Sequence, residues 1–191
     1  MKSIALLAAL LSAAPASAQS RTGEVSLSLS GGAAAPLGPI TVRRSAGVGS
    51  DFGAAVRYGL SEHFDAAFSY DSVNMRKART LRVEPFLVSL IHSYRLRGFW
   101  TPAWRLGAGP VIVHEARPRD TDSQSSFAVR TGVGADYSLT PDLGLGAWAD
   151  YLFAAHSNSD SREVSAATLS FTLTWRLGKL QARTVPQRVA L

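Results

Sequence analysis

The chain has 191 residues, no cysteine and a formal charge of +6 at neutral pH. The lack of cysteine excludes a disulfide framework and a thiolate metal site. The positive charge is scattered, mostly arginine, and comes without a recognition helix or an aromatic RNA-binding motif, so we expect no nucleic-acid partner. The sequence also lacks a phosphate loop and a zinc-binding histidine pair, and we expect no cofactor.

Residues 1–18 have the three parts of a cleavable export signal. Lys2 supplies the positive start, Ile4 to Leu11 the apolar run, and Ala16-Ser17-Ala18 the small-residue cleavage site. The apolar run is too short to cross a bilayer as a helix, and no later stretch approaches about 20 uninterrupted apolar residues. The sequence therefore predicts an exported chain with one domain at 19–178 and a short tail at 179–191.

Eight later segments alternate between apolar and polar residues. The clearest is Thr168–Leu177, where Leu169, Phe171 and Leu173 share one face and Arg176 lies on the other. Because successive side chains of a strand point to opposite faces, this pattern predicts strands with one apolar and one polar face. The eight predicted strands span about 24–35, 47–60, 64–73, 81–96, 104–115, 127–139, 143–154 and 168–177.

Two details of these strands carry further expectations. Pro85 removes a ladder hydrogen bond from the fourth strand, so we expect irregular pairing near it. His92 and His114 are predicted on strands near the outward face, a position more typical of an interface residue than of a metal ligand.

The connections alternate between short and long. The short ones are Leu60–His63, Arg97–Ala103 and Leu139–Asp142, and the long ones are Pro36–Ala46, Asn74–Thr80, Ala116–Ser125 and Ala155–Val164. This alternation is typical of an up-and-down barrel in an outer membrane. We therefore predict an all-β, eight-stranded antiparallel transmembrane barrel with three short periplasmic turns and four longer external loops.

The composition favours an apolar face that is turned outward, to lipid. The polar face is mostly Gly, Ala and Ser, which suits the narrow interior of an eight-stranded barrel. Charged residues make up only 18% of the chain, which is thin for a soluble surface, so a soluble periplasmic ligand barrel is a weaker alternative. Aromatic residues near both strand ends predict two girdles at the membrane interfaces. They are Tyr58, Phe64, Tyr94, Trp104, Tyr137 and Trp175 near the short turns, and Tyr70, Phe127, Tyr151 and Phe153 toward the long loops.

Charges of both signs lie on the predicted interior face. Because an unpaired buried charge is costly, we expect them to form ion pairs in the lumen. Such a network either plugs the lumen and fixes the strand register or provides a path for ions; we predict the plug, with a narrow channel as the alternative. The residues of this predicted network are Arg57, Asp65, Asp71, Arg95, Arg105, Glu115, Arg130, Asp136, Asp150 and Arg176.

The predicted external loops carry a group of cations. Arginine binds phosphate in a bidentate manner, so these residues are candidate contacts for lipopolysaccharide phosphates. The alternative is that they are solvated loop charges. They are Arg43, Arg44, Arg76, Lys77, Arg79, Arg117 and Arg119.

Several segments resemble a known group, the small eight-stranded outer-membrane barrels of the outer-membrane protein A type and the wider outer-membrane β-barrel-domain family. The segments are Ala108-Gly109-Pro110-Val111, Thr131 to Tyr137 with the turn that follows, and Trp175-Arg176-Leu177. The resemblance implies an outer-membrane location, insertion by the barrel-assembly machinery, and contact with outer-membrane lipid and lipopolysaccharide. Because the sequence predicts a full-length barrel with no catalytic set, we expect a monomer with a structural role or a surface-binding role through its external loops.

The sequence offers one weak candidate for catalysis. Some outer-membrane barrels hydrolyse lipid A acyl chains with a histidine, a serine and a carboxylate, and His156, Ser157 and Glu163 are the residues of these types in the last loop. Adjacent strand residues face opposite ways, which disfavours His156 and Ser157 as partners. We therefore predict a protein that is not an enzyme, with a lipid A deacylase-like hydrolase as a second alternative.

Overall fold

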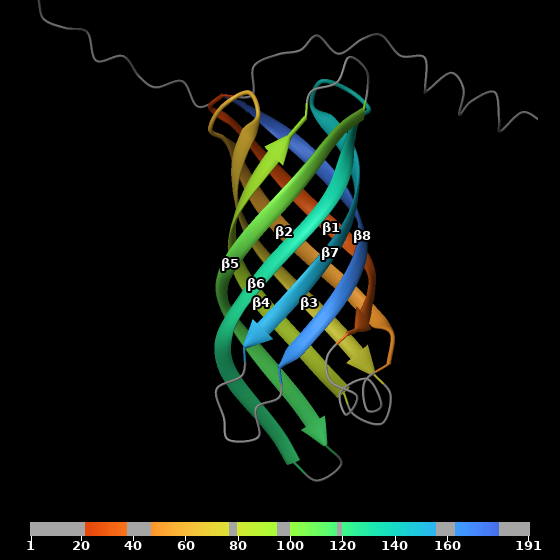
Figure 1. Cartoon of the computed structure of the whole chain (residues 1–191). Helices are drawn as coiled ribbons and strands as arrows, with labels where there is room; N and C mark the ends of the chain where they lie inside the picture. The colour runs from red at the N-terminus through yellow and green to blue at the C-terminus, as the bar shows by residue number, and fades with distance from the viewer. Residues whose placement is uncertain are drawn as a thin grey trace, which may run out of the picture.

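The computed structural model describes residues 22–37, 47–76, 80–94, 100–117, 120–155 and 163–179. Eight strands form one closed barrel in which each strand pairs with its sequence neighbours and β8 pairs with β1 (Figure 1). All pairings are antiparallel, as predicted. The strands are β1 (Glu24–Pro36), β2 (Gly49–Gly59), β3 (Phe64–Arg76), β4 (Thr80–Ser93), β5 (Trp100–Arg117), β6 (Asp120–Ser138), β7 (Leu143–Ala155) and β8 (Val164–Lys179).

The apolar face of the strands is the outside of the barrel. On β8, Phe171 is 69% exposed while the next residue, Thr172, is 5% exposed. The same alternation continues around the barrel through exposed residues such as Leu29, Phe68 and Val88. A soluble protein rarely exposes so large an apolar area, so this belt is suited to contact with hydrocarbon. Among the described residues, no helix is long and apolar enough to cross a bilayer.

The two ends of the barrel differ. We call the end with the tight connections the turn end and the opposite end the loop end. At the turn end, Leu60 and Leu139 each donate a main-chain hydrogen bond to the first residue of the following strand, Phe64 and Leu143. At the loop end, β5 continues to Arg117 and β6 begins at Asp120. Most of the predicted loop 116–125 is therefore strand. This pair projects beyond the other strands in Figure 1.

Pairing is irregular around Pro85, as expected from its missing N–H. The β4–β5 ladder pairs Pro85 with Val111 and resumes at Val88 with Ala108, so the register is kept across an interruption. The register shifts in the β1–β8 pair instead, between Val25 and Ser26.

The interior has two layers. Toward the loop end, buried apolar side chains from seven strands form a plug that fills the barrel. The residues of the plug are Ala34, Val73, Met75, Leu81, Val83, Leu87, Val111, Val113, Ala128, Leu152, Ala154, Val164 and Ala166. Toward the turn end, the interior is polar and charged. The sequence predicted a polar interior along the full length, and the apolar plug corrects that expectation for the loop-end half.

Candidate functional site

Buried ion pairs connect strands across the polar layer. Arg57 on β2 lies 3.1 Å from Asp136 on β6, and Arg130 on β6 lies 2.7 Å from Asp71 on β3. Arg105 donates two hydrogen bonds to Asp150, at 2.6 and 2.5 Å. In a low-dielectric interior these pairs leave neither charge without a counter-charge, so removal of one partner alone is costly.

Trp148 occupies the centre of this layer. It is 1% exposed, and the guanidinium carbons of Arg105 and Arg57 lie 4.6 and 5.7 Å from the ring centroid. Cations over an indole face are attracted to its π-electrons. The indole and the two arginines therefore leave little open space at mid-barrel.

Inward-facing glycines make room for these large side chains. A Cβ on Gly132 would overlap the carboxylate of Asp150, and one on Gly134 would overlap the ring of Trp148. A Cβ on Gly53 would likewise overlap the carboxylate of Asp71, and one on Gly146 would overlap the carboxylate of Asp136. The Gly-rich polar face of the sequence is therefore the space that the charged side chains of neighbouring strands occupy.

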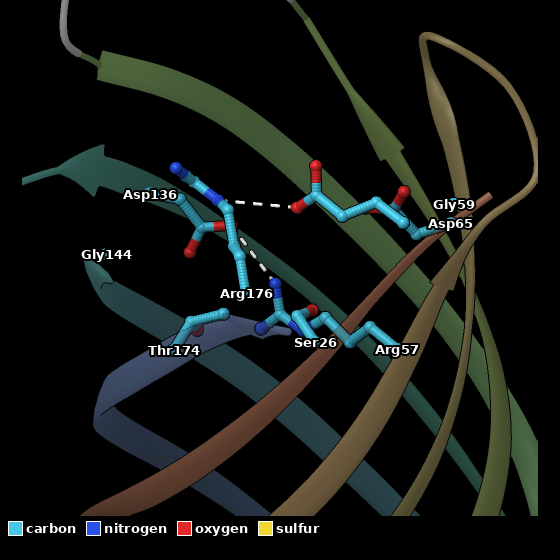
Figure 2. A pocket seen from close by; sticks show the side chains of 9 residues that line it. Ser26, Arg57, Gly59, Asp65, Asp136, Gly144, Thr174 and Arg176 are labelled. Atoms are coloured by element: carbon cyan, nitrogen blue, oxygen red, sulfur yellow. Dashed lines mark hydrogen bonds and ion pairs between the residues drawn. The ribbon is translucent and has the colours of Figure 1, made fainter. Parts of the chain in front are cut away.

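The turn end of the lumen is a small recess. Figure 2 shows Arg57 and Arg176 projecting into it, with Arg57 directed toward Asp136. Arg176 lies 3.5 Å from Glu24 and donates to the main-chain oxygen of Pro141 at 2.7 Å. The free volume is about 20 Å³, room for about one water molecule.

The outer wall changes character toward the loop end. The register aligns Ala54, Tyr70, Phe86, Pro110 and Phe127 in one outward row, the last row that is apolar on all five of these strands. The two rows beyond it carry a polar group that we call the outer collar. The outer collar consists of Ser50, Ser72, Asn74, Arg82, Glu84, His114, Ser123 and Ser125.

Glu84 is the hub of the outer collar. Its Oε1 accepts hydrogen bonds from the Tyr70 hydroxyl at 2.7 Å and lies 2.5 Å from Arg82 Nη2. Its Oε2 lies 3.0 Å from His114 Nε2, and His114 Nδ1 lies 2.8 Å from Ser123 Oγ. One chain of contacts thus runs across four adjacent strands.

A cationic groove borders the outer collar. Arg76, Arg82 and Asn74 line it together with Ser50, Ser72 and the start of β2, and its volume is about 560 Å³. Arg76 is exposed, and the Arg82 side chain is 49% exposed. Two guanidinium groups with amide and hydroxyl donors are suited to an anionic group such as phosphate.

The predicted lumen residues fall into three groups. Arg176 faces inward at the turn end, and Glu115 lies on the inward face at the loop end, half-buried. Arg95 lies outside the described residues. The residues that face the polar layer are Arg57, Asp65, Asp71, Arg105, Arg130, Asp136 and Asp150.

The predicted girdle residues lie on outward positions of the wall. Tyr137 differs from the other girdle residues because it is only 8% exposed. It packs against Trp100, with the two ring centroids 5.1 Å apart. Trp100, which the prediction omitted, is 56% exposed and takes the lipid-facing place. The other nine are Tyr58, Phe64, Tyr94, Trp104 and Trp175 at the turn end and Tyr70, Phe127, Tyr151 and Phe153 toward the loop end.

The remaining predicted sites fall largely outside what the structure describes. Among the loop cations, Arg76 is exposed at the end of β3 and Arg117 ends β5; Arg43, Arg44, Lys77, Arg79 and Arg119 are outside the described residues. His156 and Ser157 are also outside them, and Glu163 is exposed beside the start of β8. In the described part of the chain, no group of three His, Cys, Asp or Glu residues is placed to hold a metal ion.

Comparison with solved structures identifies the fold. Neisserial surface protein A matches with a TM-score of 0.67 at 15% identity, covering 82% of this chain and 98% of that one. The N-terminal β-barrel domain of Pseudomonas aeruginosa OprF matches with a TM-score of 0.57 at 14% identity, covering 82% and 100%. The chain has the fold of the small eight-stranded outer-membrane β-barrels. Ail, the attachment invasion locus protein of Yersinia pestis, is a further match, with a TM-score of 0.51 at 16% identity and coverage of 81% and 99%.

Sequence comparison adds nothing to this result, because no protein-family model and no curated protein sequence matches the chain. At these identities the structural matches establish the fold alone. The role of the protein has to be argued from its own residues.

The outer collar and the apolar plug were not predicted from the sequence, for the same reason. On β3 and β4 both lie where the strand pattern inverts, with polar residues facing out and apolar residues facing in. On β4, Arg82 and Glu84 face out while Leu81 and Val83 face in. Following the alternation past Tyr70 into the predicted loop would have revealed this inversion.

Proposed function

We propose that the protein is an integral β-barrel of the outer membrane whose lumen is closed and whose functional surface is its outer wall and loop end. The turn end then faces the periplasm and the loop end faces the cell exterior. The outward apolar belt, the predicted export signal and the fold support this placement.

The filling of the lumen is the observation that carries the proposal. The plug is formed by side chains such as Val83, Leu87 and Leu152, which are at most 1% exposed. On the turn-end side of the plug, Trp148 and the two arginines beside it, Arg57 and Arg105, fill the polar layer. An eight-stranded barrel is only wide enough for its own side chains, and here they take that space.

With the lumen closed, the cationic groove on the outer wall is the candidate binding site. We propose that Arg76 and Arg82 bind phosphate groups of lipopolysaccharide at the loop-end membrane boundary, where this groove opens outward. In this proposal the barrel has a surface-binding role, and its contacts with lipopolysaccharide stabilise the outer leaflet around it.

Planar-bilayer recording tests the closed lumen. Purified wild-type protein should insert without ion-conducting steps, because the buried side chains of the plug fill the lumen of the described strands. A barrel in which Leu87 and Leu152 are both replaced by glycine loses two of the three leucines of the plug and serves as the comparison. Regular conductance steps from the wild type would contradict the proposal and favour a narrow channel.

Lipopolysaccharide binding tests the groove. Arg76→Ala with Arg82→Ala removes two charge-assisted donors from the groove and should weaken binding to the detergent-solubilised protein at least about 10-fold. Lys179→Ala removes one exposed cation from the opposite end of the barrel and is the matched control for Arg76→Ala and Arg82→Ala measured singly. Equal loss in the control would show that general charge, not the groove, binds the lipid.

A further inference from the structure

The contact chain of the outer collar contains an arrangement that the proposed function does not use. Ser123 Oγ lies 2.8 Å from His114 Nδ1, and His114 Nε2 lies 3.0 Å from Glu84 Oε2. With the proton on Nε2, His114 donates to the carboxylate and its Nδ1 accepts from the serine. A hydroxyl, an imidazole and a carboxylate in this order are the groups by which proteins activate a serine nucleophile.

We infer that Ser123, His114 and Glu84 form a serine esterase site that hydrolyses acyl esters of membrane lipids. The inference goes beyond the proposed function; the two share only Arg82, which lines the groove and also binds Glu84. It also differs from the predicted hydrolase alternative, because none of these residues is in the last loop and they come from three adjacent strands, β6, β5 and β4.

The hydrogen bonds of Glu84 favour this role over a loose surface contact. Tyr70 and Arg82 both bind Oε1, which leaves Oε2 directed at His114. The Glu84 side chain is only 13% exposed although it is on the outer wall. The carboxylate is therefore held in one orientation, as a positioning group for a catalytic imidazole must be. Glu84 is a positioning residue, and Ser123 and His114 are the catalytic residues.

The location of the site indicates the substrate class. Ser123 lies on the outer wall two outward rows beyond Phe127, the last apolar row of β6. Two rows correspond to about 10 Å of height for strands that tilt by about 40°. Ile112 lies between the apolar row and His114 on β5. The acyl chain of a lipid can thus remain against the apolar belt while its ester carbonyl reaches the serine.

The serine is open to a substrate. Ser123 is exposed, and the His114 side chain is 35% exposed.

The reaction is an ordinary two-step hydrolysis. Ser123 Oγ attacks the ester carbonyl carbon and its proton passes to His114 Nδ1. The bond to the alcohol oxygen breaks, His114 protonates that oxygen, and the acyl group remains on Ser123. Water then attacks the acyl-serine, giving its proton to His114, and the fatty acid leaves as Ser123 recovers a proton. The net change is ester plus water to alcohol plus fatty acid.

The first test is covalent labelling of the folded barrel. A long-chain alkyl fluorophosphonate should modify Ser123 in detergent-solubilised protein, and peptide mass spectrometry locates the adduct. Ser125→Ala is the matched control, since Ser125 is on the same strand and face, is exposed, and is outside the contact chain. Labelling should persist in Ser125→Ala and be lost in Ser123→Ala and His114→Ala. Heat-modifiable migration on gels verifies that each variant is folded.

The second test measures release of fatty acid from two lipid sources. Wild-type protein is incubated with lipopolysaccharide aggregates in one arm and with phosphatidylethanolamine–phosphatidylglycerol vesicles in the other. Release in either arm that falls about 10³-fold or more in Ser123→Ala, and is unchanged in Ser125→Ala, supports the site and identifies the lipid. Neither label nor release from the wild type, or release that survives Ser123→Ala, overturns it.

Glu84 has a test of its own because it acts through His114. Glu84→Gln should lower kcat by roughly 10²- to 10⁴-fold with a smaller change in KM, since an amide no longer orients the imidazole. Glu84→Asp keeps the charge and should restore part of the rate. Equal losses of rate and thermal stability in both variants would instead indicate a structural role and contradict the assignment.

Discussion

Arg57 on β2 and Asp136 on β6 meet across the full width of the barrel, with Nη1 3.1 Å from Oδ2. In a ring of eight strands, β2 and β6 are four strands apart in either direction. Both side chains are nearly buried, at 6% and 11% exposure. This pair therefore joins opposite walls directly, which neighbouring-strand ladders cannot do.

Breaking this pair should destabilise the barrel strongly. Arg57→Ala leaves Asp136 as an uncompensated buried charge, and the expected loss is about 3–5 kcal/mol. The double replacement Arg57→Met with Asp136→Leu removes both charges and should recover most of that loss. Urea unfolding in lipid vesicles, followed by tryptophan fluorescence, measures the difference. A double variant as unstable as the single one would contradict this account of the pair.

Two glycines should respond differently to the same substitution. Gly132→Ala places a Cβ against the Asp150 carboxylate and 2.9 Å from the Ala149 carbonyl oxygen, so overpacking should cost about 1–3 kcal/mol. Gly31→Ala is the matched control, because its Cβ meets only the outward ring of Phe52 at 3.6 Å. The unfolding midpoint should fall for Gly132→Ala alone. A similar fall in both would assign the effect to strand flexibility and not to space in the lumen.

Asp51 should be replaceable without loss. It is 3% exposed, lies opposite Val73 where the polar layer meets the plug, and its Oδ1 makes no hydrogen bond among the described residues. A buried carboxylate with an unpaired oxygen costs stability. Asp51→Asn should therefore fold as stably as the wild type or more so, by about 1 kcal/mol. A large drop in the unfolding midpoint would show that the charge is needed.

The outer apolar belt predicts that a charged substitution costs more stability near the middle of the bilayer than near its edge. Phe171 is 69% exposed near the middle of β8, and Leu177 is 62% exposed near its turn end. Phe171→Arg should cost about 2–4 kcal/mol in vesicles, whereas Leu177→Arg should cost about 0–1 kcal/mol. Stability measured in vesicles decides the point. Equal costs at the two positions would argue against a hydrocarbon layer centred on Phe171.

The sequence predicted the barrel well because period-two alternation is a direct consequence of strand geometry. Every strand that was expected is present, and Leu169, Phe171 and Leu173 lie on the outward face as their pattern indicated. The same rule placed Arg130 and Asp150 on the inward face. Short turns such as Leu139–Asp142 could also be predicted, because Pro141 and Asp142 are strong turn formers.

The sequence did not predict which side chains meet across strands. Pairing Arg57 with Asp136, or Ser123 with His114 and Glu84, requires the register of several ladders at once. No local pattern encodes that register, since it depends on where each strand begins. The loop-end extension of β5 to Arg117 and of β6 from Asp120 was not predicted for a related reason. Asp, Ser and Thr favour turns, yet here they continue the β5–β6 hairpin.

The central claim, that the apolar face meets hydrocarbon and the alternate face is enclosed, has one direct measurement. The chain has no cysteine, so a single cysteine placed in turn at residues 168–175 carries the only spin label. In vesicles, collision with dissolved oxygen should peak at 169, 171, 173 and 175 and be low at the residues between them. The same collision rate at neighbouring positions, or peaks at Thr172 and Thr174, would contradict the account.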